Sequence, residues 1–140
     1  MEPIAGSLVA SIMSRHVVSV DYDDRLSTVK RIFDTHGFHH LLVVENGRLH
    51  GVLSDRDLLR ALSPFIGTLS ETTRDSHTLD KRVHQIMTRK LITVSPHTTL
   101  TEAIDLFLEQ RVSCLPVIDA ERRPVGVLTW RDVLRVVRPS

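Results

Sequence analysis

Residues 51–57 read Gly-Val-Leu-Ser-Asp-Arg-Asp, and residues 126–132 read Gly-Val-Leu-Thr-Trp-Arg-Asp. In both stretches a hydroxyl residue stands three positions before an aspartate and directly after a glycine and two apolar residues. The two stretches are 75 positions apart (126 − 51). Further identical residues occur on either side of them, and those before the turn at Asp119 are 74 positions apart (86 − 12). The chain is therefore a tandem duplication of residues 12–60 and 86–135.

Each copy begins with a short β-rich stretch, at residues 17–20 and 91–94, followed by an amphipathic helix. In each helix the apolar residues are spaced by three and four, which places them on one face; they are Leu26, Val29, Ile32 and Phe33 in copy one, and Leu100, Ala103, Ile104 and Phe107 in copy two. Thr99 stands three residues before Glu102, which is the pattern of a capping box. The start of the second helix is therefore the better marked of the two.

A hairpin and a closing helix complete each copy. In copy one the apolar runs 41–44 and 49–53 flank Asn46-Gly47, the strongest short hairpin signal. The corresponding runs in copy two are 115–118 and 125–128, and the closing helices are expected at residues 55–62 and 131–137. The pattern predicts an α/β (α+β) fold built from two β-α-β-β-α repeats related by a pseudo-twofold axis.

The expected organisation is a first repeat at residues 1–62, a linker at 63–85 and a second repeat at 86–140. The linker opens with the helix stop Ser63-Pro64, continues through the polar tract 70–77, and then places Leu79, Val83 and Ile86 at helical spacing. A helix is therefore expected to lead into the second copy. One repeat alone has little apolar surface to bury, so we expect the two copies to share a core.

Composition narrows the classes of function. Of the 140 residues 41% are hydrophobic, and 18 basic side chains nearly balance 17 acidic ones, so no charge block predicts nucleic-acid or membrane binding. The apolar runs have the length of strands, and no signal-peptide pattern is present at the N-terminus, so a cytoplasmic location is expected. The single cysteine, Cys114, predicts neither an internal disulfide nor a cysteine-based metal site.

The repeated hydroxyl-x-x-Asp pattern has two interpretations, which the sequence leaves open. Ser54 and Thr129 fit helix N-caps, with Asp57 and Asp132 as their reciprocal partners, and capping alone explains the spacing. The same geometry also suits a nucleotide, because a helix N-terminus offers N–H groups to phosphate and a carboxylate can accept ribose hydroxyls. Arg56 and Arg131 would then add cationic donors to phosphate.

Other residues suggest chemistry that their context disfavours. His36, His39 and His40 resemble metal ligands, but Gly37 is expected to end the helix before His39, so the three need not share a face. Cys114 resembles a nucleophile, but no oxyanion hole or third partner accompanies it.

Two further features have ordinary structural readings. Trp130 is a packing residue more often than a stacking platform. The basic residues of the last helix form a solvated face more often than a nucleic-acid contact; these are Arg131, Arg135 and Arg138.

The Ile-Met-x-Arg start and the Gly-Val-Leu-[Ser/Thr]-x-x-Asp ending occur in both copies. Copy two also contains Val-Ser-Pro-His-Thr-Thr-Leu-Thr-Glu-Ala at residues 94–103 and Val-Ser-Cys-Leu-Pro-Val-Ile-Asp at 112–119. The chain therefore resembles a tandem pair of cystathionine-β-synthase (CBS) domains, a Bateman module, over nearly its whole length. It resembles the stand-alone bacterial members of that family, and no separate catalytic or transporter domain is expected.

The resemblance implies regulatory binding of an adenine nucleotide in two clefts between the copies. One cleft would join Ser54 and Asp57 to the base-binding residues Ile92, Val112, Ser113 and Cys114. The other would join Thr129 and Asp132 to Val18, Phe38, His39 and His40. In the family's energy-sensing kinase subunit a His-Arg pair at the position of residues 39–40 reaches phosphate. Here the second member is a histidine, whose charge depends on pH.

The copies differ at two places in this pattern. Ser113-Cys114 stands where copy one has His39-His40, and Leu42 stands where copy two has Pro116. The two sites are therefore expected to differ in ligand binding.

The resulting hypothesis is a cytoplasmic, non-catalytic sensor of AMP, ADP, ATP or a related adenosyl ligand. No catalytic cofactor and no metal are expected, and the nucleotide acts as a regulatory ligand. The resemblance implies a homodimer and an unidentified protein partner, without membrane or nucleic-acid contact. The alternative is an interaction or scaffold module with no bound nucleotide, in which the aspartates serve only as caps; an enzyme is the third reading.

Overall fold

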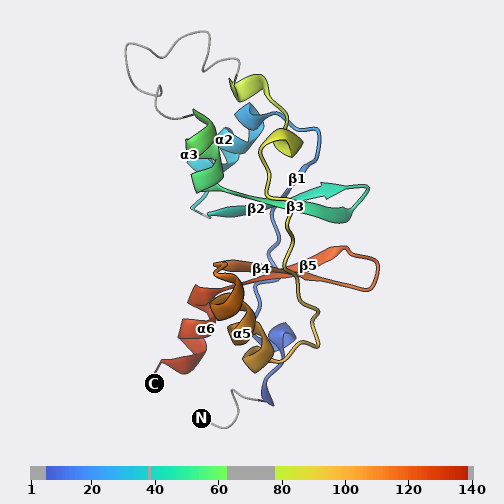
Figure 1. Cartoon of the computed structure of the whole chain (residues 1–140), viewed down its shortest axis with the longest axis vertical. Helices are drawn as coiled ribbons and strands as arrows, with labels where there is room; N and C mark the ends of the chain where they lie inside the picture. The colour runs from blue at the N-terminus through green and yellow to red at the C-terminus, as the bar shows by residue number, and fades with distance from the viewer. Residues whose placement is uncertain (1–5, 38, 63–77, 139–140) are drawn as a thin grey trace. The chain divides into compact units, whose positions relative to one another are not determined.

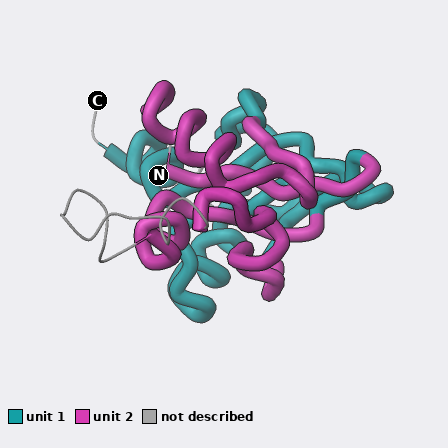
Figure 2. Tube along the Cα trace, turned by 90° about the horizontal axis from the view of Figure 1, so that it is seen from above, with its two compact units in different colours: residues 1–17, 47–49, 92–140 teal, residues 18–46, 50–91 magenta. Residues whose placement is uncertain are grey.

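The computed structural model describes residues 6–37, 39–62 and 78–138, which form two compact units (Figure 2). Unit 1 comprises residues 1–17, 47–49 and 92–140, and unit 2 comprises residues 18–46 and 50–91. Each unit thus takes its sheet and helices mainly from one copy. The segment that precedes each copy's first strand belongs to the other unit, so the units divide the chain differently from the sequence repeats.

Unit 2 is built on a three-stranded sheet in the order β1 (Ser19–Asp21), β2 (His40–Glu45), β3 (Arg48–Ser54), in which β1 and β2 run parallel. Helices α2 (Leu26–Thr35) and α3 (Asp55–Leu62) lie on the same side of this sheet (Figure 1). The two helices are amphipathic, and their apolar faces cover the sheet. The predicted strand-helix-hairpin-helix order is confirmed for this copy.

Unit 1 repeats this plan with a smaller sheet. Strands β4 (Cys114–Ile118) and β5 (Pro124–Thr129) pair antiparallel, with an irregularity in register between Val117 and Ile118. Helices α5 (Leu100–Gln110) and α6 (Trp130–Val137) pack on one side of the hairpin (Figure 1). Both helices were predicted from the sequence, and α6 begins one residue earlier than expected.

The strand predicted at residues 91–94 is wrong in extent, because a single parallel bridge between Val94 and Val117 remains there. In unit 2 the N–H of Leu42 donates to the carbonyl of Val18 and extends the β1–β2 ladder. Pro116 occupies the position of Leu42 in unit 1. Proline has no N–H to donate, so the ladder cannot extend toward Ile92.

The continuous helix predicted across Leu79, Val83 and Ile86 is also wrong. Residues 78–80 are helical, but Arg82 is extended and bridges Arg25, and the carbonyl of Lys81 accepts from the N–H of Leu26. These contacts to another part of the chain replace the hydrogen bonds that a helix would need. A short 3₁₀ helix, η2 (Val83–Gln85), follows.

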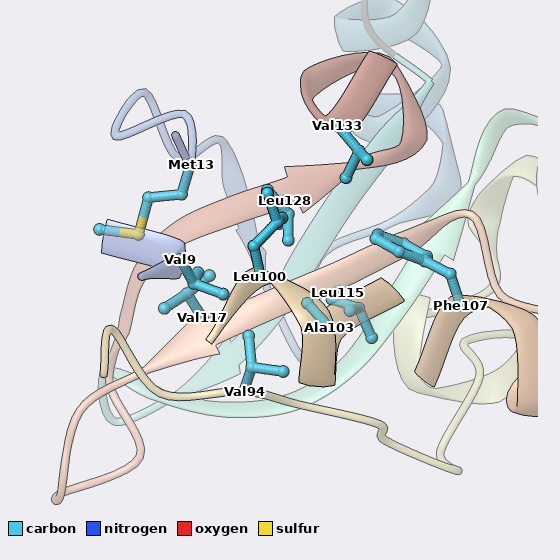
Figure 3. Close-up of a cluster of buried hydrophobic side chains, with 10 residues drawn as sticks. All are labelled: Val9, Met13, Val94, Leu100, Ala103, Phe107, Leu115, Val117, Leu128 and Val133. Atoms are coloured by element: carbon cyan, nitrogen blue, oxygen red, sulfur yellow. The ribbon is translucent and has the colours of Figure 1, made fainter. Parts of the chain in front are cut away.

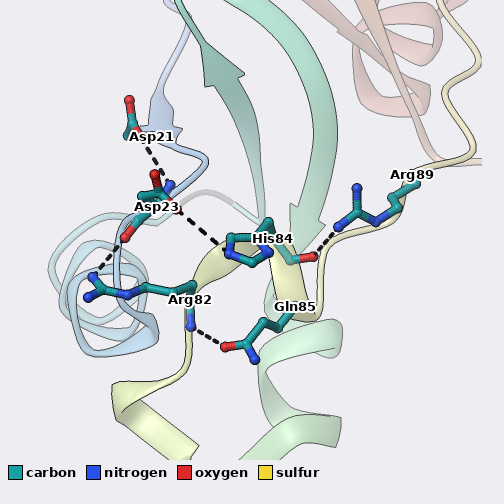
Figure 4. A network of polar contacts seen from close by, with 6 residues as sticks. All are labelled: Asp21, Asp23, Arg82, His84, Gln85 and Arg89. Carbon is teal, nitrogen blue, oxygen red and sulfur yellow. Dashed lines mark hydrogen bonds and ion pairs between the residues drawn. The ribbon is translucent and has the colours of Figure 1, made fainter.

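Side chains also fasten the η2 segment to unit 2 (Figure 4). The guanidinium of Arg82 donates to the carbonyl of Asp23 at 2.9 Å, and the ring of His84 stacks on that of Tyr22 with 4.5 Å between centroids. The guanidinium of Arg89 donates to the carbonyl of His84 at 2.8 Å. Residues 78–91 thus pack within unit 2.

The equivalent segment at the N-terminus packs in unit 1. The 3₁₀ helix η1 (Val9–Ser11) places Val9 and Met13 against residues of α5, β4 and β5 (Figure 3). Hydrogen bonds from the N–H of Val9 to the carbonyl of Thr98, and from the N–H of Leu100 to the carbonyl of Ser7, hold the segment there. The structural repeat therefore begins at least three residues before residue 12, the start inferred from sequence identity.

Each unit has its own apolar core. Of the residues predicted for the buried helix faces, Leu26, Val29, Leu100, Ala103 and Phe107 are buried, whereas Ile32, Phe33 and Ile104 pack against the cores only partly buried. The core of unit 2 holds Val20, Leu26, Val29, Leu41, Val43, Leu53, Leu58, Leu62, Val83 and Met87. The core of unit 1 holds Val9, Met13, Val94, Leu100, Ala103, Phe107, Leu115, Val117, Leu128 and Val133 (Figure 3).

Local turn chemistry agrees with the sequence. Asn46 and Gly47 both have positive φ, 54° and 76°, as a two-residue type I′ hairpin turn requires. Helix α2 ends at Thr35, before Gly37, so His39 lies outside it. The predicted helix stop at Ser63-Pro64 and the polar tract 70–77 lie outside the described residues. Within the described ranges, no helix has the length and apolar character needed to cross a membrane.

Candidate functional site

In unit 2 the hydroxyl-x-x-Asp pattern forms a reciprocal cap at the start of α3. The N–H of Asp57 donates to the Ser54 hydroxyl at 3.1 Å, and the N–H of Ser54 donates to Oδ2 of Asp57 at 2.9 Å. Oδ1 of Asp57 lies 4.0 Å from the Arg60 guanidinium, and the Asp57 side chain is 21% exposed. The predicted capping role is confirmed, and this carboxylate remains partly accessible.

The histidines before and at the start of β2 lie beside this cap. Nδ1 of His39 is 2.9 Å from Oδ2 of Asp55, and the N–H of Asp55 donates to the carbonyl of His39 at 3.0 Å. His40 is half-buried, and burial lowers its pKa below the usual 6.5; Asp55 opposes this, His39 adds to it and Asp57 opposes it. Ser54, Asp57, His39 and His40 are thus brought together within unit 2.

The other residues predicted for copy one are placed less distinctively. Val18 is partly buried and its carbonyl accepts from the N–H of Leu42. Arg56 is exposed on the first turn of α3. Phe38 lies outside the described residues.

Unit 1 builds the same cap at the start of α6. The N–H of Thr129 donates to Oδ2 of Asp132 at 2.9 Å, and the N–H of Asp132 donates to the Thr129 hydroxyl at 3.4 Å. Arg135 lies 3.6 Å from Oδ1 of Asp132, whose side chain is 12% exposed. The capping interpretation is therefore confirmed in both copies, with the acidic residue at the positive end of each helix.

Cys114 lies at the start of β4, buried in unit 1. Burial raises the pKa of its thiol to about 12, and the negative charge of Asp132 adds to this effect. The thiol is therefore protonated near neutral pH, which argues against a nucleophilic role. Ser113 precedes it and is exposed, and Ile92 and Val112 pack as partly buried residues against the unit 1 core.

Trp130 and Arg131 complete the unit 1 set. The ring of Trp130 stacks on the buried Phe107, with 4.8 Å between centroids and 29° between planes. The packing reading of Trp130 is therefore supported. Arg131 is exposed on the first turn of α6, in the same place as Arg56 on α3.

The candidate metal ligands do not form a cluster. Within the described ranges, no group of three or more histidine, cysteine, aspartate or glutamate side chains is arranged to hold a metal ion. His36 caps the C-terminal end of α2, whereas His39 pairs with Asp55.

Asp55 is the residue that the sequence reasoning missed. It stands next to Ser54 in the quoted motif, but its partner His39 is sixteen residues earlier, and only the pairing of β2 with β3 brings the two together. Copy two has Trp130 at the equivalent position, so the repeat itself carried no signal for a carboxylate there.

A surface pocket of about 560 Å³ also occurs within unit 1, between residues 93–98 and 118–120. It lies at the Ile118 end of β4, whereas Cys114 begins the strand. None of the predicted site residues lines it.

Comparison with known proteins agrees with this architecture. The chain is 33% identical to a CBS domain-containing protein of Dictyostelium discoideum over 91% of its own length and 88% of that protein's. Other curated relatives are longer, and the chain spans 46% and 22% of the next two.

Two solved structures cover nearly the same extent as this chain. The structure of CBSX2 in complex with AMP matches with a TM-score of 0.78 and 28% identity, covering 94% of this chain and 96% of that one. The CBS domain pair of protein MJ0100, in complex with 5′-methylthioadenosine and S-adenosyl-L-methionine, matches with a TM-score of 0.77 and 25% identity, covering 94% and 100%.

The family model for the CBS domain matches the chain twice, at residues 9–64 and 83–139. These matches coincide with the duplication and begin at Val9 and Val83, where η1 and η2 start. The chain belongs to the CBS domain family as a tandem pair, a Bateman module.

Proposed function

We propose that this protein is a non-catalytic regulatory module that binds an adenine-containing ligand through the residues at the starts of α3 and α6. The observation that carries the proposal is the pair of hydroxyl-x-x-Asp caps, each with an adjacent exposed arginine. Similar CBS pairs crystallised with AMP and with adenosyl ligands support the ligand class.

Capping and ligand binding are compatible at these carboxylates. Oδ2 of Asp57 accepts from the N–H of Ser54, while Oδ1 lies 4.0 Å from Arg60. A carboxylate has two oxygens with about four acceptor positions, so ribose hydroxyls can bind without breaking the cap. Arg56 and Arg131 stand one residue before each aspartate, where they can donate to a phosphate.

The remaining predicted residues are assigned to the base and to phosphate. We assign Ile92, Val112, Ser113 and Cys114 to the base in one site, and Val18, Phe38, His39 and His40 to the other. The nucleotide acts as a regulatory ligand that reports on a cellular adenylate or adenosyl pool, including energy sensing. The regulated partner is a further protein.

Stabilisation by ligand tests the proposal. A ligand at 100 times its dissociation constant adds roughly 2.7 kcal/mol to the free energy of unfolding. Thermal unfolding with AMP, ADP, ATP, adenosine and S-adenosylmethionine should show such a shift for at least one compound. The double variant Asp57→Ala plus Asp132→Ala should lose it. Absence of any shift, or a full shift in the double variant, would favour a scaffold without nucleotide.

We also propose a homodimer formed through the closing helices. Leu59 of α3 and Leu134 of α6 occupy equivalent positions in the two copies, and each is 59% exposed. Exposed leucines at matched places on two helices suit an apolar contact with a second copy. Light scattering should report a dimer, and Leu59→Glu plus Leu134→Glu should give a folded monomer.

A further inference from the structure

Two hydrogen bonds join the start of β2 to the start of α3 in unit 2. The His39 ring and the Asp55 carboxylate are 2.9 Å apart, and the Asp55 N–H donates to the His39 carbonyl at 3.0 Å. Both side chains are partly exposed, His39 by 61% and Asp55 by 38%. The Asp55 carboxylate therefore stands beside the proposed nucleotide-binding cap and remains open to solvent.

Charged and titratable groups surround His40 from both elements that it contacts. These are Asp55 and Asp57 on α3 and His39 beside it, with Arg56 between the two aspartates on the helix. Burial lowers the pKa of His40 more than any neighbour changes it. At pH 8 His40 is therefore neutral, while the permanent cations on this helix are Arg56 and Arg60, whose guanidinium lies 4.0 Å from Oδ1 of Asp57.

The equivalent place in unit 1 has different chemistry. Trp130 stands at the position of Asp55 and packs on Phe107. Cys114 stands at the position of His40, and its thiol, with a pKa of about 12, does not titrate near neutrality. Among the residues at the equivalent positions Asp132 supplies the carboxylate, and Arg135 lies 3.6 Å from its Oδ1. These positions of unit 1 thus hold neither the added carboxylate nor an imidazole.

We propose that Asp55, which contacts His39, determines which ligand charge is accepted at the site to which His39 and His40 are assigned: its carboxylate disfavours phosphate at alkaline pH, and protonation of His40 admits a phosphate-bearing adenine ligand. This inference rests on the proposed function, and it adds a specificity-determining residue and a proton dependence to that site. Binding of adenosine, which is uncharged, depends neither on the charge of Asp55 nor on protonation of His40.

The expected size of the change in AMP affinity with pH follows from proton linkage. A phosphate dianion near His40 favours the imidazolium, so a ligand that carries phosphate takes up protons as it binds. Affinity can then rise by up to about tenfold per pH unit for each proton taken up. The second pKa of a phosphate monoester is about 6, so AMP stays mainly dianionic between pH 7.0 and 8.0 and does not itself produce this change.

Titration calorimetry of the full chain with AMP and with adenosine, at pH 7.0 and 8.0 and constant ionic strength, tests the inference. AMP should bind about three to ten times more tightly at pH 7.0, while adenosine changes by less than about twofold. Asp55→Asn should tighten AMP binding at pH 8.0 by about three- to tenfold. Its asparagine still accepts the hydrogen bond from His39, so the local structure is retained.

Matched variants separate the local effect of Asp55 on AMP affinity from the effect of a change in the net charge of the protein. Asp80→Asn makes the same change in net charge at an exposed residue of unit 2, and it should leave AMP affinity unaltered. His40→Gln should abolish the pH dependence of AMP affinity. This variant tests the inference even where Asp55→Asn does not fold.

The outcomes distinguish this inference from the proposed function. AMP binding that is equal at both pH values, or equal in Asp55→Asn and wild type, overturns the role of Asp55 and leaves the proposed function standing. No binding of AMP, adenosine or any other adenine ligand overturns both.

Discussion

Gly51 and Gly126 occupy equivalent positions at which a side chain has no room. A Cβ built on Gly51 would lie 2.5 Å from the sulfur of Met87 and 3.0 Å from the carbonyl oxygen of Thr88. A Cβ on Gly126 would meet Met13 and Ser14 at the same distances. Met87 and Met13 can shift, but the backbone oxygens cannot shift without breaking the bridges at Thr88 and Ser14. The glycine of the repeated motif is thus required by close approach of another backbone.

Gly51→Ala and Gly126→Ala should each lower the free energy of unfolding by about 1–3 kcal/mol, the usual cost of overpacking. Urea unfolding followed by circular dichroism measures the loss. Gly6→Ala is the control, because nothing lies within 4 Å of its added Cβ. Wild-type stability in both motif variants would contradict the proposed close packing.

His40 should make the stability of the fold depend on pH, because its surroundings change its pKa. Its pKa is lowered in the folded state by burial, so the unfolded chain binds a proton first as the pH falls. Above about pH 6.5 both states are neutral and His40 contributes nothing to pH dependence. Below that value it destabilises the fold progressively until it becomes protonated in the folded state as well.

Comparison of wild type with His40→Gln should therefore show a smaller loss of stability in the variant between pH 7.5 and 5.5. Thermal unfolding without ligand at both pH values measures this difference. A variant that loses as much stability as wild type over this interval would show that His40 is not the linked group. Other titrating groups contribute equally to both proteins and cancel in the comparison.

At the scale of elements, three helices have hydroxyl caps that the sequence predicted. Thr99 accepts from the N–H of Glu102 at the start of α5, as Ser54 and Thr129 accept at the starts of α3 and α6. Ser54 and Thr129 belong to the proposed ligand sites, whereas Thr99 does not. The chain therefore contains an internal control for the contribution of capping alone.

Thr99→Ala and Thr129→Ala should each cost about 1 kcal/mol of stability, as loss of an N-cap does. Only Thr129→Ala should also weaken binding of an adenine ligand, measured by calorimetry at a temperature where both variants are folded. Serine at either position should restore the cap. Equal affinity in the two alanine variants would assign Thr129 to capping alone.

Elements without a local signal were predicted less well. The shortened first strand of copy two follows from Pro116, whose missing N–H matters only because the fold places it beside this segment, where the N–H of Val94 donates to its carbonyl. The broken helix at residues 78–85 follows from pairing of Lys81 and Arg82 with residues 25–26. Helical spacing of Leu79, Val83 and Ile86 was real, but contacts with a distant segment outweighed it.

At the scale of the whole molecule, the segment before each copy packs in the other copy's unit. Val9 is fully buried in the core that contains α5 and β4, and Val83 is fully buried in the core that contains α2 and β2. Each copy therefore lacks part of its core when it is separated from the other. Each unit therefore depends on a segment that precedes the other unit's main copy in the chain.

Val9→Ala and Val83→Ala should each lower the free energy of unfolding by about 2 kcal/mol, from two lost methyl groups and the cavity that they leave. Chemical denaturation measures this, with Leu8→Ala as the control because Leu8 is 39% exposed. Val9 precedes the sequence repeat as identity alone defines it. An unchanged stability in Val9→Ala would therefore argue that the unit begins at residue 12.

The sequence by itself determined the duplication, the α2, α3, α5 and α6 helices, the Asn46-Gly47 turn and the caps at Ser54, Thr99 and Thr129. These features are encoded in short windows, where spacing of three or four residues and turn chemistry act locally. Only the tertiary structure decided the exchange of Val9 and Val83 between units and the pairing of Asp55 with His39. Such contacts join residues far apart in the chain, and they depend on strand register and packing that no local pattern specifies.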